Sequence, residues 1–192
     1  MNKLVVIING RGGIGKDTLI NAVKKDYNVT NFSSIDKIKE IAAVGGWDFT
    51  DKSDKGRKLL ADLKQAFLAY NDLPFTETIE HINAFLEKEP TNPWYSVMFV
   101  HIREPEEISR VIGKLVDSGV LVRNQAKVTT LLIESSRAKG SYGNAADDGV
   151  YGYHYMFKYV NDMPEEKATE NFRQYFNSVV MYTCEESFYP VV

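Results

Sequence analysis

A short apolar run followed at once by a glycine-rich segment constrains the fold of this chain more than any other feature. The run Leu4–Ile8 is continuous and β-branched, which is typical of a strand buried on both faces of a parallel sheet. The glycine-rich segment Gly10–Thr18 follows it, and Leu19, Ile20 and Val23 then share one face of a helix. Strand, glycine loop and helix in this order predict the start of a βαβ unit.

The rest of the chain alternates strand and helix patterns, which predicts a three-layer α/β fold of about five parallel strands with helices on both faces. Further strands are predicted at 29–32, 96–102, 127–133 and 153–160, and helices at 35–41, 54–70, 74–86, 105–115 and 164–176. Within 54–70, five apolar side chains between Leu59 and Tyr70 fall on one stripe, as in an amphipathic helix. Asp72 is a candidate cap for the helix that follows.

The glycine segment has the pattern G-x-x-x-x-G-K, with a hydroxyl residue one place later than usual. Its glycines let successive backbone N–H groups point at one centre, where phosphate oxygens are bound. Lys16 is expected to reach the β- and γ-phosphates, and Thr18 to offer a hydroxyl to a phosphate or a magnesium ion. A turn that only connects strand to helix is the alternative, but the strand before and the helix after favour phosphate binding. The candidate phosphate-binding residues are Arg11, Gly12, Gly13, Ile14, Gly15, Lys16, Asp17 and Thr18.

The order Gly-Lys-Asp-Thr resembles the nucleoside monophosphate kinases, and is most similar to deoxynucleoside monophosphate kinases of the phage type. The resemblance implies a single P-loop kinase domain over 1–192, with a helical acceptor-binding insert at 33–92 and a lid-like loop at 137–152. It also implies ATP and Mg²⁺ as cofactors, and phosphoryl transfer to a nucleoside or deoxynucleoside monophosphate. Asp17 stands where the general pattern has a magnesium-binding hydroxyl, so Asp17 and Thr18 are the candidate metal ligands.

Two arginines follow predicted strands and are, with Lys16, the candidate catalytic residues. Arg103 and Arg137 are expected at the carboxyl ends of their strands, the edge of a parallel sheet where ligands bind. There they are expected to stabilise the charge of a phosphoryl group in transfer. The alternatives are an ion pair of Arg103 with Glu106 or Glu107 on the next helix, and an ordinary surface loop around Arg137.

The acceptor is expected to bind in the insert, where Ser34, Trp47 and Arg57 are the candidate contacts. Trp47 has the ring to stack on a base, and Arg57 the guanidinium to hold a phosphate. An aromatic anchor next to a solvated charged stretch is the other interpretation. Asp147 and Asp148 are interpreted as a solvated turn rather than a metal pair, and the three histidines as structural.

Composition excludes few functions but sets limits on the partners. A net charge of −3 over 192 residues gives no broad attraction for nucleic acid or an anionic membrane. Cys184 is the one cysteine, which suits a reducing compartment, and a cytoplasmic location is expected. The oligomeric state, monomer or homodimer, stays open. A dephospho-coenzyme A kinase or another small-metabolite kinase is an alternative function, and a non-transferring nucleotide switch or ATPase is a second one.

Overall fold

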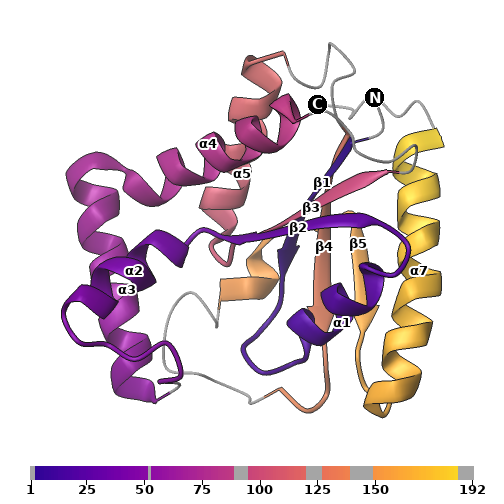
Figure 1. Ribbon diagram of the computed structural model, residues 1–192, viewed down its shortest axis with the longest axis horizontal. Helices are drawn as coiled ribbons and strands as arrows, with labels where there is room; N and C mark the ends of the chain where they lie inside the picture. Colours follow the sequence, from indigo (N-terminus) through magenta and orange to yellow (C-terminus); the bar gives the residue numbers. More distant parts are fainter. Residues whose placement is uncertain (1–2, 52, 89–94, 120–126, 139–148, 186–192) are drawn as a thin grey trace.

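Five parallel strands form the central sheet, in the order β2-β3-β1-β4-β5 (Figure 1). The computed structural model describes residues 3–51, 53–88, 95–119, 127–138 and 149–185. The strands are β1 (Lys3–Asn9), β2 (Asn28–Ser33), β3 (Ser96–His101), β4 (Lys127–Glu134) and β5 (Phe157–Val160). The predicted five-stranded parallel sheet is therefore confirmed.

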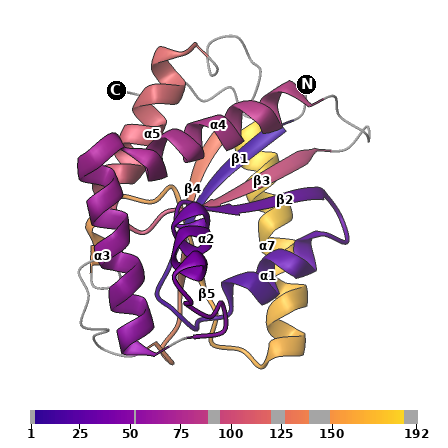
Figure 2. The same cartoon turned by 60° about the vertical axis from the view of Figure 1, so that its left-hand side comes forward.

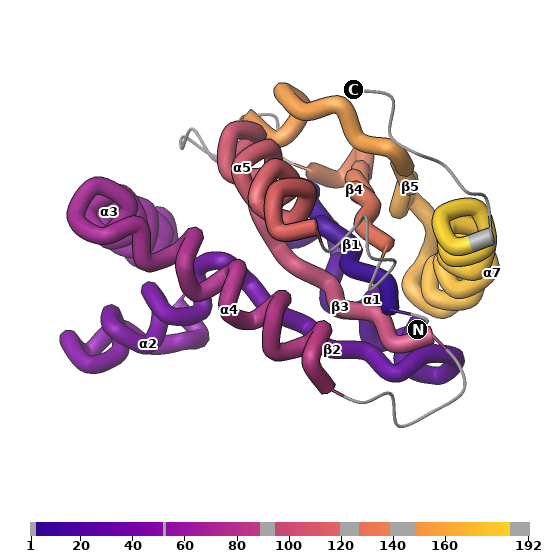
Figure 3. The backbone as a smooth tube through the Cα atoms, turned by 90° about the horizontal axis from the view of Figure 1, so that it is seen from above, coloured from indigo at the N-terminus to yellow at the C-terminus, as the bar shows by residue number. Residues whose placement is uncertain are grey.

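Helices cover both faces of this sheet, which makes the fold the predicted three-layer α/β architecture. One face carries α1 (Lys16–Val23) and α7 (Glu165–Glu185), and the other carries α4 (Leu73–Glu87) and α5 (Pro105–Asp117) (Figure 3). Two helices, α2 (Asp36–Val44) and α3 (Asp54–Asn71), lie to one side of the sheet and come forward in Figure 2. A 3₁₀ turn, η1 (Gly149–Gly152), precedes β5.

The core is built around β1, every residue of which is buried. Alternate side chains of the strand enter two different cores, because successive side chains of a strand point to opposite faces. Val6 packs in one core with Phe172 and Phe176 of α7. Ile7 packs in the other core with Ile108 of α5. The continuous apolar pattern of β1 thus has its physical cause in helices on both sides.

Two expectations about the elements are wrong in detail. The last strand begins at Phe157 rather than at 153, because the backbone at 149–152 forms η1 and 153–156 is irregular. The apolar stripe of α3 is not a buried face, since Leu59 is 42% exposed and Tyr70 is 83% exposed. The long side chain that α3 buries is Lys64, which is 3% exposed.

Lys64 can be buried because two carboxylates at the start of α5 surround its ammonium group. Its Nζ atom lies 2.6 Å from Glu104 Oε2 and 2.6 Å from Glu107 Oε2. Burial raises the pKa of the Glu107 carboxyl to about 7, in spite of the nearby Lys64, while the charge of Lys64 holds the pKa of Glu104 low against its own burial. This triad fastens α3 to the first turn of α5.

A second contact fastens the turn between α3 and α4 to the same helix. Asp72 occupies the left-handed region at φ 56° and makes no side-chain cap bond, contrary to its expected role. Its carboxylate instead pairs with Arg110 of α5, accepting from both terminal guanidinium nitrogens, Nη1 and Nη2. Arg110 also lies over the ring of Phe75, at 4.2 Å from the ring centroid. Within the described residues, no helix is long and apolar enough to cross a membrane.

The raised pKa of Glu107 predicts that the unfolding free energy falls as the pH rises, and that Glu107→Gln removes this dependence. The folded state holds the Glu107 proton more tightly than the unfolded chain does, so this group loses its stabilising contribution as the pH rises from near 4.5 to about 7. Relative to wild type, Glu107→Gln should gain on the order of 1–3 kcal/mol of unfolding free energy between about pH 5 and about pH 8.

Urea denaturation at the two pH values measures this difference. Glu106→Gln, an exposed acid on the same turn, is the control and should show no such gain. A Glu107→Gln difference that does not change with pH would contradict the raised pKa.

Candidate functional site

Two glycines of the loop between β1 and α1 are required by its backbone. Gly10 has φ 142°, and a Cβ atom there would lie 2.5 Å from the carbonyl oxygen of Ile133 in β4. Gly15 has φ 87° at the N-cap of α1, and a Cβ atom there would lie 2.9 Å from Asn161 Nδ2. L-residues with side chains rarely adopt these conformations, so the loop can pack this closely only with glycine. The loop is thereby pressed against β4 and the segment after β5.

Lys16 is the first residue of α1 and folds back over its own loop. Its ammonium group donates to the carbonyl oxygen of Gly10 and, at 2.8 Å, to that of Arg11. The helix α1 begins directly after the loop, and a helix N-terminus carries partial positive charge. Cation and helix end together make this loop a place where an anion is stabilised.

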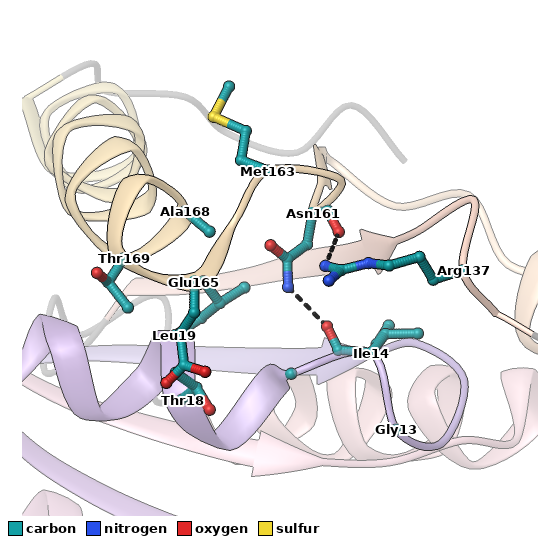
Figure 4. Close-up of a pocket in the computed structure, with 11 residues that line it drawn as sticks. Gly13, Ile14, Thr18, Leu19, Arg137, Asn161, Met163, Glu165, Ala168 and Thr169 are labelled. Carbon is teal, nitrogen blue, oxygen red and sulfur yellow. Dashed lines mark hydrogen bonds between the residues drawn. The ribbon is translucent and has the colours of Figure 1, made fainter.

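A pocket of about 240 Å³ lies on the α7 side of the loop (Figure 4). The loop and α1 form one wall, and the segment after β5 with the first turns of α7 forms the other. The lining residues are Gly13, Ile14, Gly15, Thr18, Leu19, Arg137, Asn161, Met163, Glu165, Ala168 and Thr169. Most of the second wall was not predicted from the sequence, because isolated residues such as Asn161 and Thr169 belong to no motif.

Asn161 connects the two walls of this pocket. Its side-chain Nδ2 atom donates to the backbone carbonyl oxygen of Ile14 at 2.7 Å. Its backbone carbonyl oxygen accepts from Arg137 Nη2, also at 2.7 Å (Figure 4). Its Oδ1 atom is buried and has no hydrogen-bond partner among the described residues. An unpaired buried acceptor costs free energy, and a donor that reached this oxygen would recover it.

The structure places the two candidate arginines on opposite sides of the glycine-rich loop between β1 and α1. Arg103 follows β3 and Arg137 follows β4, and these two strands flank β1 in the sheet. Arg137 lines the pocket, whereas Arg103 is not among the lining residues. Glu107, considered from the sequence as a partner of Arg103, is paired with Lys64 instead.

Asp17 and Thr18, the candidate metal ligands, lie on the first turn of α1. Asp17 is exposed and Thr18 is half-buried. The described part of the chain contains no group of three acidic, histidine or cysteine side chains that could hold a metal. Asp147 and Asp148, with most of the predicted lid-like loop, fall outside the described residues.

His101 ends β3 beside the loop and adds no positive charge to it. Its Nε2 atom lies 2.8 Å from Asn31 Oδ1. Burial, with the nearby charge of Lys16, lowers the pKa of His101 to about 4, so the ring is neutral near pH 7.

The acceptor candidates extend from just before α2 to the first turn of α3. Ser34 is buried, and its backbone N–H donates to the carbonyl of His101 at 3.1 Å. Trp47 is half-buried against Phe49, with ring centroids 5.4 Å apart, and its Nε1 atom is buried without a hydrogen-bond partner in the described structure. Arg57 lies on the first turn of α3.

The crowding at Gly10 predicts that two glycines of one loop differ in their tolerance of a methyl group. Gly10→Ala should cost more than about 3 kcal/mol of unfolding free energy, because backbone strain adds to overlap with the Ile133 carbonyl. Gly13→Ala should cost about 1–2 kcal/mol, because nothing lies within 4 Å of its Cβ position and only the left-handed φ of 77° opposes it. Chemical denaturation of both variants measures the difference, and equal costs would contradict the packing of Gly10 against β4.

Comparisons with solved structures give distant likenesses. No protein-family model matches the chain, and no curated protein sequence matches it. A sugar kinase from Janibacter sp. HTCC2649 is 13% identical with a TM-score of 0.43, covering 92% of this chain and 95% of that one. Shikimate kinase from Aquifex aeolicus VF5 is 14% identical with a TM-score of 0.41, covering 93% and 98%. A designed protein with a P-loop NTPase fold is 10% identical with a TM-score of 0.37, covering 97% and 99%. Likeness at this level transfers neither activity nor substrate to this chain.

Proposed function

We propose that this protein transfers the γ-phosphoryl group of ATP to a small phosphorylated acceptor, a nucleoside or deoxynucleoside monophosphate. The observation that carries the proposal is the pocket of about 240 Å³ that shares Gly13–Gly15 with the phosphate loop. Sites that enclose a whole ligand usually have about 300–1,000 Å³. A smaller pocket attached to an anion-binding loop is suited to a flat base whose phosphates extend into the loop.

The polar groups of the pocket favour a base with an exocyclic amine. The buried Oδ1 atom of Asn161 needs a donor, and the amino group of adenine is one. The Nδ2 atom is already committed to Ile14, which fixes the orientation of the amide. We therefore assign the adenine ring of ATP to this pocket, between the loop and the first turns of α7.

Catalysis by this site would consist of positioning and charge stabilisation, which is what phosphoryl transfer requires. Lys16 is held at the mouth of the loop, where it can exchange its two carbonyl partners for phosphate oxygens. Arg137 approaches from the pocket side and Arg103 from the β3 side, so the two cations would flank the transferred group. Mg²⁺, held by Thr18 and Asp17 with the phosphates, would supply further charge neutralisation.

The insert of α2, α3 and α4 favours transfer over nucleotide binding alone. The turn between α2 and α3 lies at the same end of the molecule as the phosphate loop (Figure 1). We assign the acceptor to Trp47 and Arg57 in this region and to Ser34 before α2. An assay of ADP formation from ATP with a panel of nucleoside monophosphates, dephospho-coenzyme A and water separates the proposal from the small-metabolite kinase and the ATPase.

Lys16→Ala should abolish most of the turnover with little effect on stability. The variant loses the cation that would follow the γ-phosphoryl group, so turnover should fall by on the order of a thousandfold. Lys24→Ala, at the opposite end of α1, removes an exposed lysine and serves as the control. Turnover is measured by ADP formation and stability by thermal melting. Wild-type turnover in a folded Lys16→Ala variant would refute the assignment of the loop.

Filling the pocket should separate recognition of the base from recognition of the phosphates. Thr169→Phe places a ring into the pocket wall from α7, so ATP affinity should fall at least about tenfold, whereas tripolyphosphate affinity should not change. Ser178→Phe adds the same ring at an exposed site of the same helix and should change neither affinity. Isothermal titration with both ligands measures these effects, and unchanged ATP affinity in Thr169→Phe would place the base elsewhere.

A further inference from the structure

A buried asparagine directly before the phosphate loop forms hydrogen bonds with both the oxygen and the nitrogen of its side-chain amide. Asn9 is 1% exposed, and its Oδ1 atom accepts from the backbone N–H of Gly10 at 2.7 Å. Its Nδ2 atom donates to the carbonyl oxygen of Arg103 at 2.9 Å and to the hydroxyl of Tyr155 at 2.6 Å. One residue therefore joins the first N–H of the loop to the segment after β3 and to the segment before β5.

Tyr155 extends this connection to η1. Its hydroxyl accepts from Asn9 and donates to the carbonyl oxygen of Val150 at 2.8 Å. The side chain is 7% exposed, and burial raises the pKa of the hydroxyl to about 12, so it stays a donor. Hydrogen bonds that are buried and fully satisfied fix the geometry of the groups that they join.

The loop has a second, independent contact with η1. The guanidinium of Arg11 lies over the ring of Tyr151, with its central carbon 5.1 Å from the ring centroid. Tyr151 is 49% exposed, so this contact lies at the surface and the hydrogen-bonded chain through Tyr155 lies beneath it. The two contacts hold consecutive residues, Gly10 and Arg11, at the entrance of the loop.

The 3₁₀ turn is itself fixed to the core. Val150 is fully buried in the same core as Ile108 of α5. A Cβ atom at Gly152 would lie 3.4 Å from Pro105, the first residue of that helix. Because η1 is anchored in the core, its contacts with the loop can restrict the movement of the loop.

We propose that η1 supports the phosphate loop, with Tyr155 and Asn9 as positioning residues that hold its first N–H group in place. This inference rests on the proposed function for its consequence, because only a loop that binds phosphate gains from being held. With the loop ordered beforehand, less conformational entropy is lost when the phosphates bind, and affinity is higher. Loosening the support should therefore weaken nucleotide binding without removing any group that touches the nucleotide.

Tyr155→Phe tests the buried chain, and Tyr151→Leu tests the surface contact. In the nucleotide-free protein, amide hydrogen exchange in peptides that cover 8–19 should become at least about fivefold faster in both variants. ADP affinity and kcat/KM for ATP should each fall about tenfold in Tyr155→Phe, and less in Tyr151→Leu. Tyr151→Phe keeps the ring under Arg11 and should behave like wild type.

Tyr175→Phe is the matched control for the buried chain. It removes a tyrosine hydroxyl that donates to a backbone carbonyl, that of Lys158 at 2.9 Å, and should change neither loop exchange nor ADP affinity. Unchanged loop exchange in both Tyr155→Phe and Tyr151→Leu would overturn the support, even if melting temperatures fall. If Tyr155→Phe fails to fold, the exchange and affinity of exposed Tyr151→Leu against Tyr151→Phe decide the question.

The two proposals fail in different ways. A wild-type protein that binds neither ATP nor ADP refutes the proposed function, whereas the exchange comparison without nucleotide still decides whether η1 supports the loop. Faster loop exchange with unchanged ADP affinity would overturn the positioning role, because it separates loop order from binding.

Discussion

The burial of β1 between β3 and β4 is the constraint on which the rest of this structure depends. A strand covered on both faces and paired on both edges cannot shift its register without exposing an apolar side chain on each side. The position at which β1 ends is therefore fixed, and with it the position of Gly10 against the carbonyl of Ile133. The position of the glycine-rich loop is therefore set by the core together with its own glycines.

The same register explains why some parts of the site could be predicted from the sequence and others could not. The glycine spacing from Gly10 to Lys16 is a local pattern, and the helix predicted after it is α1. Asn161 and Tyr155 belong to no local pattern, because their partners Ile14 and Asn9 are reached only through the pairing of distant strands. A single polar residue in a sequence does not reveal which buried group it will meet.

The error in α3 has a related cause. Its stripe of apolar residues suggested a buried face, yet the helix buries Lys64, whose partners lie 40 and 43 residues further along the chain. A buried lysine is tolerated only when its charge is paired. Periodicity describes one helix alone. It cannot predict that a helix beside the sheet leaves apolar side chains exposed, nor that it buries a lysine between two glutamates of a distant segment.

The first turn of α5 connects the two parts that phosphoryl transfer would have to bring together. Glu104 and Glu107 hold α3 of the insert through Lys64, and Pro105 packs against η1, which contacts the phosphate loop. Arg103 immediately precedes this turn, and its carbonyl is bound by Asn9. Lys64 offsets one of the two carboxylates that follow Arg103, and the raised pKa of Glu107, about 7, leaves that carboxyl partly protonated near pH 7. A movement of α3 that shifts the first turn of α5 would therefore shift Arg103 and the entrance of the loop together. The insert and the loop are in this way coupled through one helical turn.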